Sequence, residues 1–549
     1  MNIIRAILFV GILVGGFIYF QSIQPDPEDT ASADTPALMS AAVEAGSSDT
    51  TEPATPDAVD VAAEADEEEH ALEPIDQLYL NQLVTSGQRE EAFAFAFEMG
   101  DELTEASFTA EQGVGANIGE GRRFSRFPRA DLNGPGEWGT HFPAREGGAN
   151  ATQCISCHSA PLANGAGGVA MNVVLDPAHT GDPSQYLERN TTPLFALAIP
   201  QRLAEEMSLD LYLQREGARM MACEQGSATA TLVTKGVAFG TLGFTRTAEA
   251  PCSVDIDVSG LSGIDDDLVI KPFGWKGNEA TLRSFTRGAA HNEMGLQGVE
   301  LVGDADGDYD GVTSELTVGD LTALTIYMAA LERPTSLVEL ADLGLTELAD
   351  EDRSAIMAGQ ESFAAVGCTS CHVSEMVLDE PIFREPSRTP GYYDMVFPDG
   401  SAPVDHGLRQ DTALAFDMRT DPPNNQVTLA SGEMYHLGAV KTDTTGRGVV
   451  NWYTDFKRHD MGAALADPSS PLGIGAEMFM TRSLAGVGTT GPWLHDGRAT
   501  TLHEAIMMHA GEGTQSRDAY AALSEDAQLQ LVAFLENLVI HSEGEEEDH

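Results

Sequence analysis

Cys154-Ile155-Ser156-Cys157-His158 is one of two stretches that decide the fold, and the other is Cys368-Thr369-Ser370-Cys371-His372. The pattern C-x-x-C-H is the attachment site of a c-type haem. In such a site the two thiols bond the haem covalently and the adjoining His is the proximal iron ligand. Both stretches end in His and together they use four of the six cysteines. They predict two covalently bound haems c, with a zinc knuckle or a redox dithiol as the alternative.

In this reading each motif has a fixed division of roles. The thioether ligands are Cys154 and Cys157 in the first motif, and the proximal iron ligand is His158. The second motif supplies Cys368, Cys371 and His372 in the same order. The spacing places both sulfurs on one side of a short helical turn and directs the imidazole at the iron.

The composition is strongly acidic. The 549 residues include 86 Asp and Glu against 30 Lys and Arg, which gives a formal net charge of -56. This charge argues against nucleic acid and anionic membrane surfaces as partners. It favours a basic partner protein, or a solvated acidic surface without a partner. The length allows two or three domains.

The N-terminal region predicts export. Arg5 precedes an apolar run from Ala6 to Phe20, and no Ala-x-Ala-like cleavage signal follows. We expect residues 1–24 to be an uncleaved inner-membrane anchor with the remainder in the periplasm, and cleavage to a soluble periplasmic protein is the alternative. Residues 25–74, which lack basic and aromatic residues, predict a disordered acidic linker. Residues 542–549 form an acidic tail.

An internal repeat lies between these ends. The first half runs from the first motif to a helix predicted over 317–332, and the second runs from the second motif to a helix predicted over 525–539. A further helix is predicted over 353–366, immediately before the second motif. A helix on each side of C-x-x-C-H is the layout of a cytochrome c domain. The predicted fold class is mainly α, with two tandem cytochrome c-like domains over 75–350 and 351–541.

A short element inside each half supports the duplication. The first half contains Arg283-Ser284-Phe285 and the second contains Arg482-Ser483-Leu484. A turn follows each of them, Asn292-Glu293-Met294-Gly295 in the first half and His495-Asp496-Gly497 in the second. We therefore pair these two elements as equivalents in the repeat.

A small β insertion is predicted over residues 219–270. This stretch is rich in Thr, Val, Gly and Ser and breaks the helical pattern around it. Cys223 and Cys252 lie within it and belong to neither haem motif. In an exported protein these two cysteines predict a disulfide, and two free thiols are the alternative.

With these motifs in view, the chain resembles the bacterial di-haem cytochrome c peroxidase superfamily, and within it the di-haem oxidoreductase branch. The resemblance covers residues 100–540. Besides the haem motifs, the segments that carry it are Lys271-Pro-Phe-Gly-Trp275-Lys-Gly277, Thr281-Leu-Arg283, Asn292-Glu-Met294-Gly295, His459-Asp-Met461-Gly462 and Leu494-His495-Asp-Gly497.

The resemblance implies distal iron ligands on the opposite faces of the two haems. For the second haem it indicates His509, with its neighbour Met508 or a purely structural histidine as alternatives. For the first haem, Met294 and His291 lie in the repeat-equivalent turn, and His179 lies on a loop. The distal ligand decides whether a haem passes electrons or binds substrate.

Two further side chains have roles implied by the resemblance. Trp275 would lie between the haems and couple them, unless it is a buried structural residue. Glu293 would be the acid and base that moves protons during peroxide cleavage, unless it is an exposed turn carboxylate. We therefore take Trp275 and Glu293 as the candidate catalytic residues.

Alternating carboxylates suggest a third kind of site. Asp304, Asp306, Asp308 and Asp310 precede Gly311, and Glu315 follows, in a pattern of hard oxygen ligands that suits Ca²⁺. Counted from Asp306, the twelfth position is Thr317 instead of the usual Glu. The sequence therefore leaves two alternatives for this stretch, a Ca²⁺ site and a solvated acidic turn.

The resulting expectation is a di-haem oxidoreductase. It would reduce hydrogen peroxide or a related oxidant with electrons from a small donor protein, such as a cytochrome c or a cupredoxin. The alternatives are a non-catalytic electron-transfer cytochrome and an oxidase of a partner protein or an organic substrate.

Overall fold

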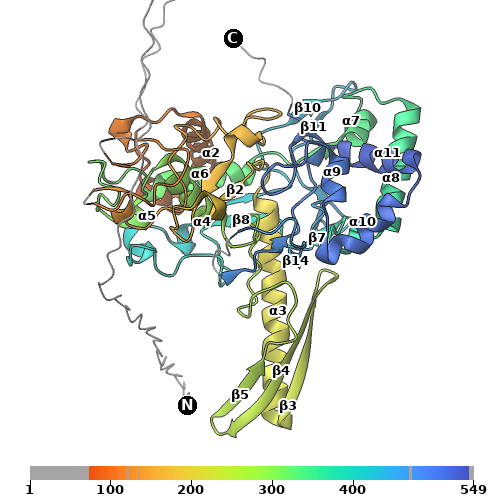
Figure 1. Cartoon of the computed structure of the whole chain (residues 1–549), viewed down its shortest axis with the longest axis horizontal. Helices are drawn as coiled ribbons and strands as arrows, with labels where there is room; N and C mark the ends of the chain where they lie inside the picture. Colours follow the sequence, from red (N-terminus) through yellow and green to blue (C-terminus); the bar gives the residue numbers. More distant parts are fainter. Residues whose placement is uncertain (1–72, 120, 122, 135, 469–472, 543–549) are drawn as a thin grey trace, which may run out of the picture. The chain divides into compact units, whose positions relative to one another are not determined.

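Two pairs of crossing helices form the frame of the described chain (Figure 1). The computed structural model describes residues 73–542 apart from 120, 122, 135 and 469–472, all within the unit His70–His549. In the first half, α2 (Arg89–Glu105) packs against α6 (Val318–Ala330). In the second half, α8 (Asp350–Ala365) packs against α11 (Glu525–Glu536). Each pair thus joins a helix that precedes a haem motif to one at the far end of the same half.

A glycine lies at each crossing. A Cβ added to Gly100 of α2 would lie 2.4 Å from the carbonyl oxygen of Ala323 in α6. A Cβ added to Gly359 of α8 would lie 1.9 Å from the carbonyl oxygen of Gln530 in α11. Both distances are far below van der Waals contact, so any larger residue would force the helices apart.

The three predicted helices are confirmed as α6, α8 and α11. Thr317 caps α6, where its side chain accepts from the Asp320 amide and Asp320 returns the bond in a capping box. Ser524 caps α11 in the same manner by accepting from the amide of Ala527. The sequence did not predict α2, because Phe93, Phe95 and Phe97 recur at every second position, a period typical of a strand.

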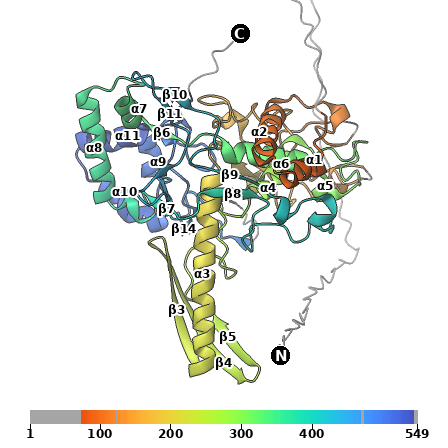
Figure 2. The ribbon, with the colours of Figure 1, turned by 180° about the vertical axis from the view of Figure 1, so that it is seen from behind.

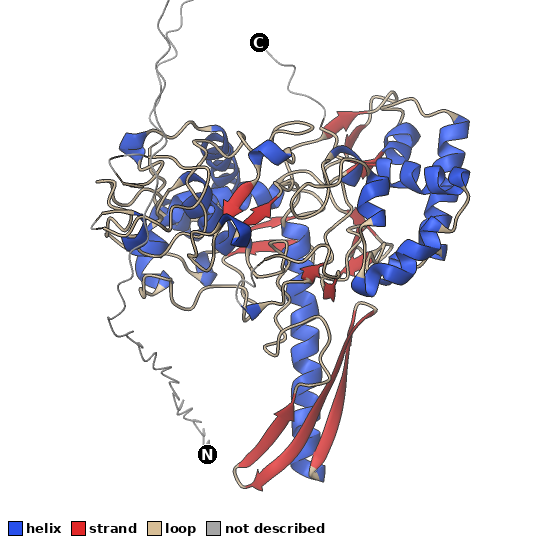
Figure 3. Ribbon diagram, in the orientation of Figure 1, coloured by secondary structure: helices blue, strands red, loops and turns tan. Residues whose placement is uncertain are grey.

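The prediction of a mainly α chain is wrong. Within the described residues 35% are helical and 16% lie in strands, and these strands form many small antiparallel sheets (Figure 3). Most of them are two to four residues long, which is too short to show a period in the sequence. The small sheets are β1 (Val173–Leu175) with β2 (Leu187–Arg189), β8 (Ile382–Glu385) with β9 (Leu414–Asp417), β10 (Gln426–Thr428) with β11 (Met434–His436), β14 (Arg458–Asp460) with β15 (Met478–Met480), β6 (Thr335–Ser336) with β16 (Leu538–Val539), and β7 (Met376–Leu378) with β13 (Gly448–Val450) and β12 (Lys441–Thr442).

The insertion in the first half is an arm made of one long helix and three strands. α3 (Ala198–Gln225) lies along a sheet of β3 (Ser227–Thr234), β4 (Val237–Glu249) and β5 (Cys252–Asp257), as both ribbon views show (Figures 1 and 2). The β part begins at Ser227, so the predicted boundary at residue 219 is wrong. Residues 219–225 continue the helix because its buried positions keep the helical period through Ala218 and Ala222.

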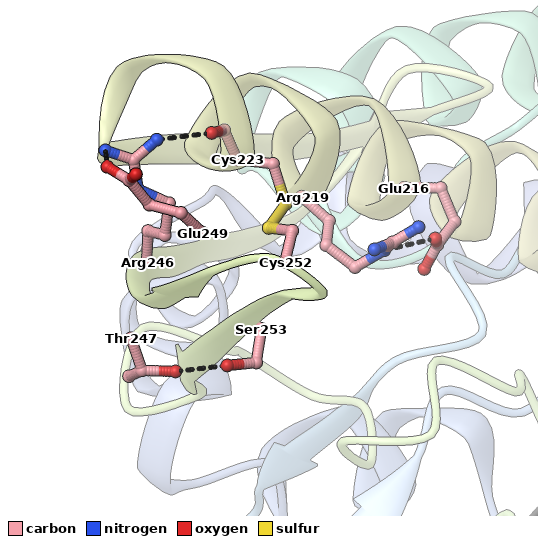
Figure 4. The surroundings of a disulfide bond; sticks show 8 residues. All are labelled: Glu216, Arg219, Cys223, Arg246, Thr247, Glu249, Cys252 and Ser253. Atoms are coloured by element: carbon pink, nitrogen blue, oxygen red, sulfur yellow. Dashed lines mark hydrogen bonds and ion pairs between the residues drawn. A yellow bond between two sulfur atoms is a disulfide. The ribbon is translucent and has the colours of Figure 1, made fainter.

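The predicted disulfide is confirmed. Cys223, near the end of α3, is bonded to Cys252, the first residue of β5, with a Cα–Cα distance of 5.9 Å (Figure 4). Beside it Arg246 of β4 donates to the carbonyl oxygen of Cys223 at 2.6 Å and pairs with Glu249 at 3.3 Å. The disulfide and this arginine both tie the outer end of the helix to the sheet.

A duplicated turn precedes one helix in each half. Phe273 and Glu279 bridge across the first turn, which leads into α4 (Leu282–Ala289) with Thr281 as N-cap. Trp493 and Ala499 bridge across the second, which leads into α9 (Leu502–Met507) with Thr501 as N-cap. Left-handed residues match as well, with φ of 77° at Gly274 and 74° at Leu494.

This correspondence corrects the pairing predicted from sequence. Arg283 lies within α4, whereas Arg482 lies in the loop after β15. The two Arg-Ser elements are therefore not equivalent. The true repeat places Trp275 at the position of His495, since both follow the left-handed residue of their turn.

Buried ion pairs join the two halves. Arg283 of α4 pairs with Glu300 of α5 (Val299–Val302) and, at 3.1 Å, with Glu385 of β8 in the second half. Arg287 pairs with Glu300 at 2.7 Å and with Asp394 at 2.9 Å. Removing one partner of such a buried set leaves an uncompensated charge, which typically costs about 3–5 kcal/mol. The remaining helices are α1 (Gln77–Thr85), α7 (Leu337–Leu343) and α10 (Thr514–Ala521).

The predicted membrane anchor, and with it the inner-membrane location, is contradicted. Across the residues that the structure describes, no helix is both long enough and apolar enough to cross a membrane. Residues 1–24 and 25–72 lie outside the described residues, as does the tail from 543 onward.

The close helix crossings predict that a methyl group added at their glycines lowers the stability of the fold. Gly359→Ala should lower the free energy of unfolding by about 1–3 kcal/mol, because the added Cβ overlaps the backbone of α11. Gly217→Ala in α3 is the matched control, since no atom lies within 4 Å of its added Cβ, and it should raise stability by up to about 1 kcal/mol. Urea unfolding measures both. Equal effects would contradict the crossing as the cause.

Candidate functional site

The second motif follows α8 directly. The left-handed Gly367, with φ of 91°, ends the helix and starts a tight turn over Cys368–Ser370. The amide of His372 donates to the carbonyl oxygen of Cys368 at 2.9 Å. Its Nδ1 bonds the carbonyl oxygen of Tyr453 at 3.0 Å, which leaves Nε2 as the nitrogen available to a metal.

An apolar cavity of about 310 Å³ lies above this turn, and both His372 and His509 line it. His509 follows α9 and its Nδ1 bonds the carbonyl oxygen of Ala505 at 2.8 Å, so its Nε2 is also left available. Burial and the neighbouring His509 lower the pKa of His372 to about 4. Both imidazoles are thus held neutral, the state in which they bind iron. Met508, the alternative distal ligand, is not among the lining residues.

The cavity also presents a half-buried cation. Arg482 lines it, donates to the carbonyl oxygen of Gly274 at 3.4 Å, and lies 5.2 Å above the ring of Trp275. Desolvation lowers its pKa to about 10, and within the described residues it forms no ion pair with a carboxylate. A desolvated guanidinium without an anion suits a ligand that brings its own carboxylate.

These residues fit a haem. Two thiols lie on the turn, two imidazoles with free Nε2 atoms face the same apolar cavity, and Arg482 could pair with a propionate. Burial raises the pKa of the Cys368 thiol to about 11. The large apolar cavity beside the turn suits a macrocycle better than a single Zn²⁺ ion, which needs only a small tetrahedral site. The donor set therefore favours haem over the zinc alternative.

Sequence reasoning assigned no role to His459, which lies beside this site. Its Nε2 bonds Asp455 at 2.8 Å and its Nδ1 bonds Glu512 at 2.8 Å. Cys371, Asp455 and His459 bring ligand atoms within 4.8 Å of one another. The only sequence signal was the His459-Asp-Met461-Gly462 segment, because one of the two carboxylates, Glu512, lies 53 residues further along the chain.

The first motif has a similar local geometry. His158 Nδ1 bonds the carbonyl oxygen of Gly165 at 3.3 Å, and burial lowers its pKa to about 4. Cys154 Sγ lies 3.8 Å from Met294 Sδ. Burial, with the nearby Glu293 and Cys157, raises the pKa of the Cys154 thiol to about 12. The structure thus brings Met294 and Glu293 to the first motif, as expected from the sequence.

A π-helical turn over Ala290–Met294 carries these two side chains. It extends α4, and the carbonyl oxygen of Glu293 accepts from the amides of Asn150 and Ala151 at 2.8 and 3.1 Å. Such turns are frequent at functional sites. Burial raises the pKa of Glu293 to about 7, which is the range in which a carboxyl group can exchange protons near neutral pH.

The two histidines considered for the first distal ligand have different positions. His291 is buried within the π-helical turn, and burial with the nearby Arg145 holds its pKa well below the usual value. His179 is exposed on its loop, with φ of 52°. The structure therefore brings His291 near the first motif and leaves His179 at the surface.

Trp275 lines the cavity beside the second motif, and its hydrogen bond to Asn190 leads to a segment that lies near the first motif. Its Nε1 donates to the carbonyl oxygen of Asn190 at 3.0 Å. Asn190, Thr191 and Thr192 line the cavity too, and the Thr192 backbone is close enough to His158 to affect its pKa. The segment 190–192 thus lines the cavity of the second motif and also lies close to His158 of the first motif.

A buried carboxylate, Asp467, fastens the region between the motifs. It accepts from Arg189 at 3.0 Å and from Lys276 at 2.9 Å, and His495 lies 3.5 Å away. The ring of His495 also stacks on Phe479 at 4.5 Å. No sequence signal predicted this cluster, because its members come from three distant stretches.

Comparison with known proteins supports the assignment of one half. Residues 424–538 match the family described as "Di-haem oxidoreductase, putative peroxidase", so the resemblance predicted from sequence is confirmed over these residues. A search of curated proteins found no match. Among solved structures, the chain is similar to hydrazine synthase of Kuenenia stuttgartiensis pressurised with xenon, with 20% identity and a TM-score of 0.19. The match covers 41% of this chain and 56% of that one, so the chain spans just over half of that protein's length.

The contacts of His459 predict a pH-dependent contribution to stability. Burial alone would lower its pKa, but Asp455 and Glu512 raise it from 6.5 to about 11. A raised pKa means that the stabilisation is complete below pH 6.5 and disappears as the pH rises through 11. His459→Gln should cost about 3 kcal/mol in urea unfolding at pH 6, and less toward pH 11. A cost that is independent of pH would contradict this reading.

Proposed function

We propose that the protein is a di-haem c-type oxidoreductase that reduces hydrogen peroxide with electrons from a small donor protein. The observation that carries this proposal is a difference between the two halves at one equivalent position. Counted from the N-caps Thr281 and Thr501, Ala289 corresponds to His509. The second site has an imidazole where the first has a methyl group, so the two sites have different ligand sets.

A bound haem supplies an iron that transfers electrons when the protein fills both axial positions, and that reacts with peroxide when one is accessible. At the second site His372 and His509, which line the same cavity, would both hold the iron. At the first site His158 would hold it. Covalent attachment would use Cys154, Cys157, Cys368 and Cys371, and the Cys154 and Cys368 thiols are otherwise protonated in their buried settings.

Glu293 is the residue that would move protons at the first site. It lies in the π-helical turn beside the first motif, and its charge contributes to the raised pKa of both Cys154 and Cys157. With its own pKa raised to about 7, it can accept and release a proton at neutral pH.

Trp275 would couple the two sites. Its ring lines the cavity beside the second motif, and its Nε1 donates to Asn190, two residues before Thr192, whose backbone lies close to His158. Arg482 lies over the ring and lends it a fixed orientation. The donor would bring electrons to the second site, and the net charge of -56 suits a basic donor such as a cytochrome c or a cupredoxin.

One observation favours a second candidate, a di-haem cytochrome that only transfers electrons. Met294 Sδ lies 3.8 Å from Cys154 Sγ, close enough to the first motif to fill the distal position there. A thioether held in that position would exclude peroxide. The two candidates therefore differ in the access of exogenous ligands to the first haem.

Electron paramagnetic resonance of the half-reduced protein distinguishes these candidates. A peroxidase should show one high-spin haem that binds cyanide, and should consume peroxide when a reduced donor is present. If both haems stay low-spin and bind neither cyanide nor peroxide, the electron-transfer function holds and the peroxidase proposal is lost.

Glu293→Gln tests the proton-transfer role. Peroxide turnover should fall by about 10²–10⁴-fold, because the amide can neither accept nor release a proton. The parent rate should change across pH 7, where Glu293 ionises, and the variant should lose this transition. Haem absorption spectra should match those of the parent. A variant with the parent's rate and pH profile would remove Glu293 from the reaction.

His509→Ala tests the second distal ligand. Haem attachment should be unchanged, while the second haem should shift from low to high spin as one imidazole is removed. His503→Ala is the matched control, since His503 lies within α9, the helix that His509 follows, but bonds Tyr520 and does not line the cavity. Identical spectra for the two variants would show that His509 is not a ligand.

A further inference from the structure

The acidic loop between α5 and α6 forms a cluster that the proposed reaction does not use. Asp306, Asp308 and Asp310 each bring a carboxylate oxygen within 4.8 Å of the others. Gly311, with φ of 94°, follows them and lets the chain turn back on itself. Three carboxylates so close together repel one another unless cations separate them.

Unpaired buried oxygens show that the cluster is incomplete as it stands. The Asp308 side chain is 0% exposed, and its Oδ2 pairs with Arg145 at 2.6 Å. Its other oxygen, Oδ1, has no hydrogen-bond partner within the described part of the chain. A fully buried carboxylate oxygen without a partner is costly, and it marks a place where a ligand can bind.

Glu315 adds a fourth carboxylate from the end of the same loop. Its Oε2 accepts from the amide of Gln297 at 2.6 Å, whereas its Oε1 is buried and has no partner among the described residues. Burial, with Asp308 and Asp310, raises its pKa to about 9. Glu315 is the acidic residue that ends the predicted stretch. A twelve-residue loop read from Asp306 would instead close at Thr317, so the spacing differs from the familiar pattern.

The charges around the cluster leave room for a divalent cation. Arg145 pairs with Asp308, and Arg123 pairs with Asp310 at 2.5 Å. These two cations balance two of the four carboxylates, so two negative charges would be uncompensated when all four are ionised. The ligand atoms are all oxygens, which excludes the imidazole and thiolate ligands that zinc and copper prefer.

We propose that Asp306, Asp308, Asp310 and Glu315 bind one Ca²⁺. Ca²⁺ accepts six to eight oxygens in an adaptable geometry, which suits a loop whose carboxylates sit at alternating positions. Mg²⁺ demands a tighter octahedron and keeps its waters, so it fits four converging carboxylates less well. This proposal does not depend on the peroxide reaction.

The site is connected to the first haem motif through Arg145. The guanidinium that holds Asp308 also donates to the carbonyl oxygens of His291 and of Gly295, the latter at 2.7 Å. These carbonyls belong to the π-helical turn with Glu293 and Met294 and to the glycine that ends it. Bound Ca²⁺ would therefore fix Asp308, Arg145 and the turn in one arrangement.

Terbium luminescence and thermal unfolding test the proposal on the full-length holoprotein. After chelator treatment, Tb³⁺ should give luminescence sensitised by Tyr309 of the loop, and Ca²⁺ should displace it at far lower concentration than Mg²⁺. Ca²⁺ should also raise the unfolding temperature. Tyr309→Phe should abolish the sensitised signal without changing Ca²⁺ binding by calorimetry. Absence of Ca²⁺ binding to the parent, or equal displacement by Mg²⁺, would overturn the proposal.

Substitutions in the loop locate the site. Asp308→Asn and Glu315→Gln should each weaken Ca²⁺ binding at least tenfold. Asp304→Asn is the matched control, because Asp304 is exposed in the same loop and lies outside the cluster, and it should bind as the parent does. If both variants bind Ca²⁺ as tightly as the control, the assigned ligands are wrong. Should either variant fail to fold, the binding and displacement data of the parent still decide the question.

Discussion

The close approach of two helices in each half is the constraint on which the haem motifs depend. α8 can lie against α11 only because Gly359 has no side chain, and Cys368 begins its turn almost directly after α8 ends. The depth of that crossing therefore sets the position of the thiols and of His372. On the other side of the cavity, α9 presents His509 from a helix fixed by its own capping box at Thr501. Two independently anchored segments thus define the distance between the imidazoles.

The distribution of positive charge is the second organising feature. The chain has few basic residues for its length, and several of them are buried: Arg145, Arg283, Arg287 and Lys276 all hold carboxylates in the interior. Because these cations are buried together with carboxylates, the interior set is close to neutral and the net negative charge of the chain comes from the other residues. Arg482 differs from them within the described residues, since it lines the cavity without a carboxylate partner.

The features that could be predicted from the sequence are those encoded locally. The two haem motifs, the caps of α6 and α11, and the Cys223–Cys252 disulfide each depend on residues close together or on residue types with few other uses. The position of Met294 and Glu293 beside the first motif was also expected, because they belong to one of the segments on which the family resemblance rests.

The features that could not be predicted depend on distant or very short stretches. The Asp467 cluster joins residues from both halves, and Glu512, one partner of His459, lies 53 residues after it. The two- to four-residue strands have no period to detect, and the alternating phenylalanines of α2 indicate the wrong element. The acidic stretch ending in Glu315 was visible in the sequence, but the burial of Asp308 and Glu315, which leaves one oxygen of each without a partner among the described residues, was not.

The duplicated turns before α4 and α9 bear on the history of the molecule. Their backbones agree down to the left-handed residue, although a glycine holds that position in one copy and Leu494 in the other. The next residue is Trp275 in the first copy and His495 in the second. Burial lowers the pKa of His495 to about 4, so both rings are uncharged at neutral pH. The indole offers only an N–H donor, whereas the neutral imidazole offers one donor and one acceptor. The two copies of the turn therefore share one backbone conformation, while the side chain that follows the left-handed residue differs between them.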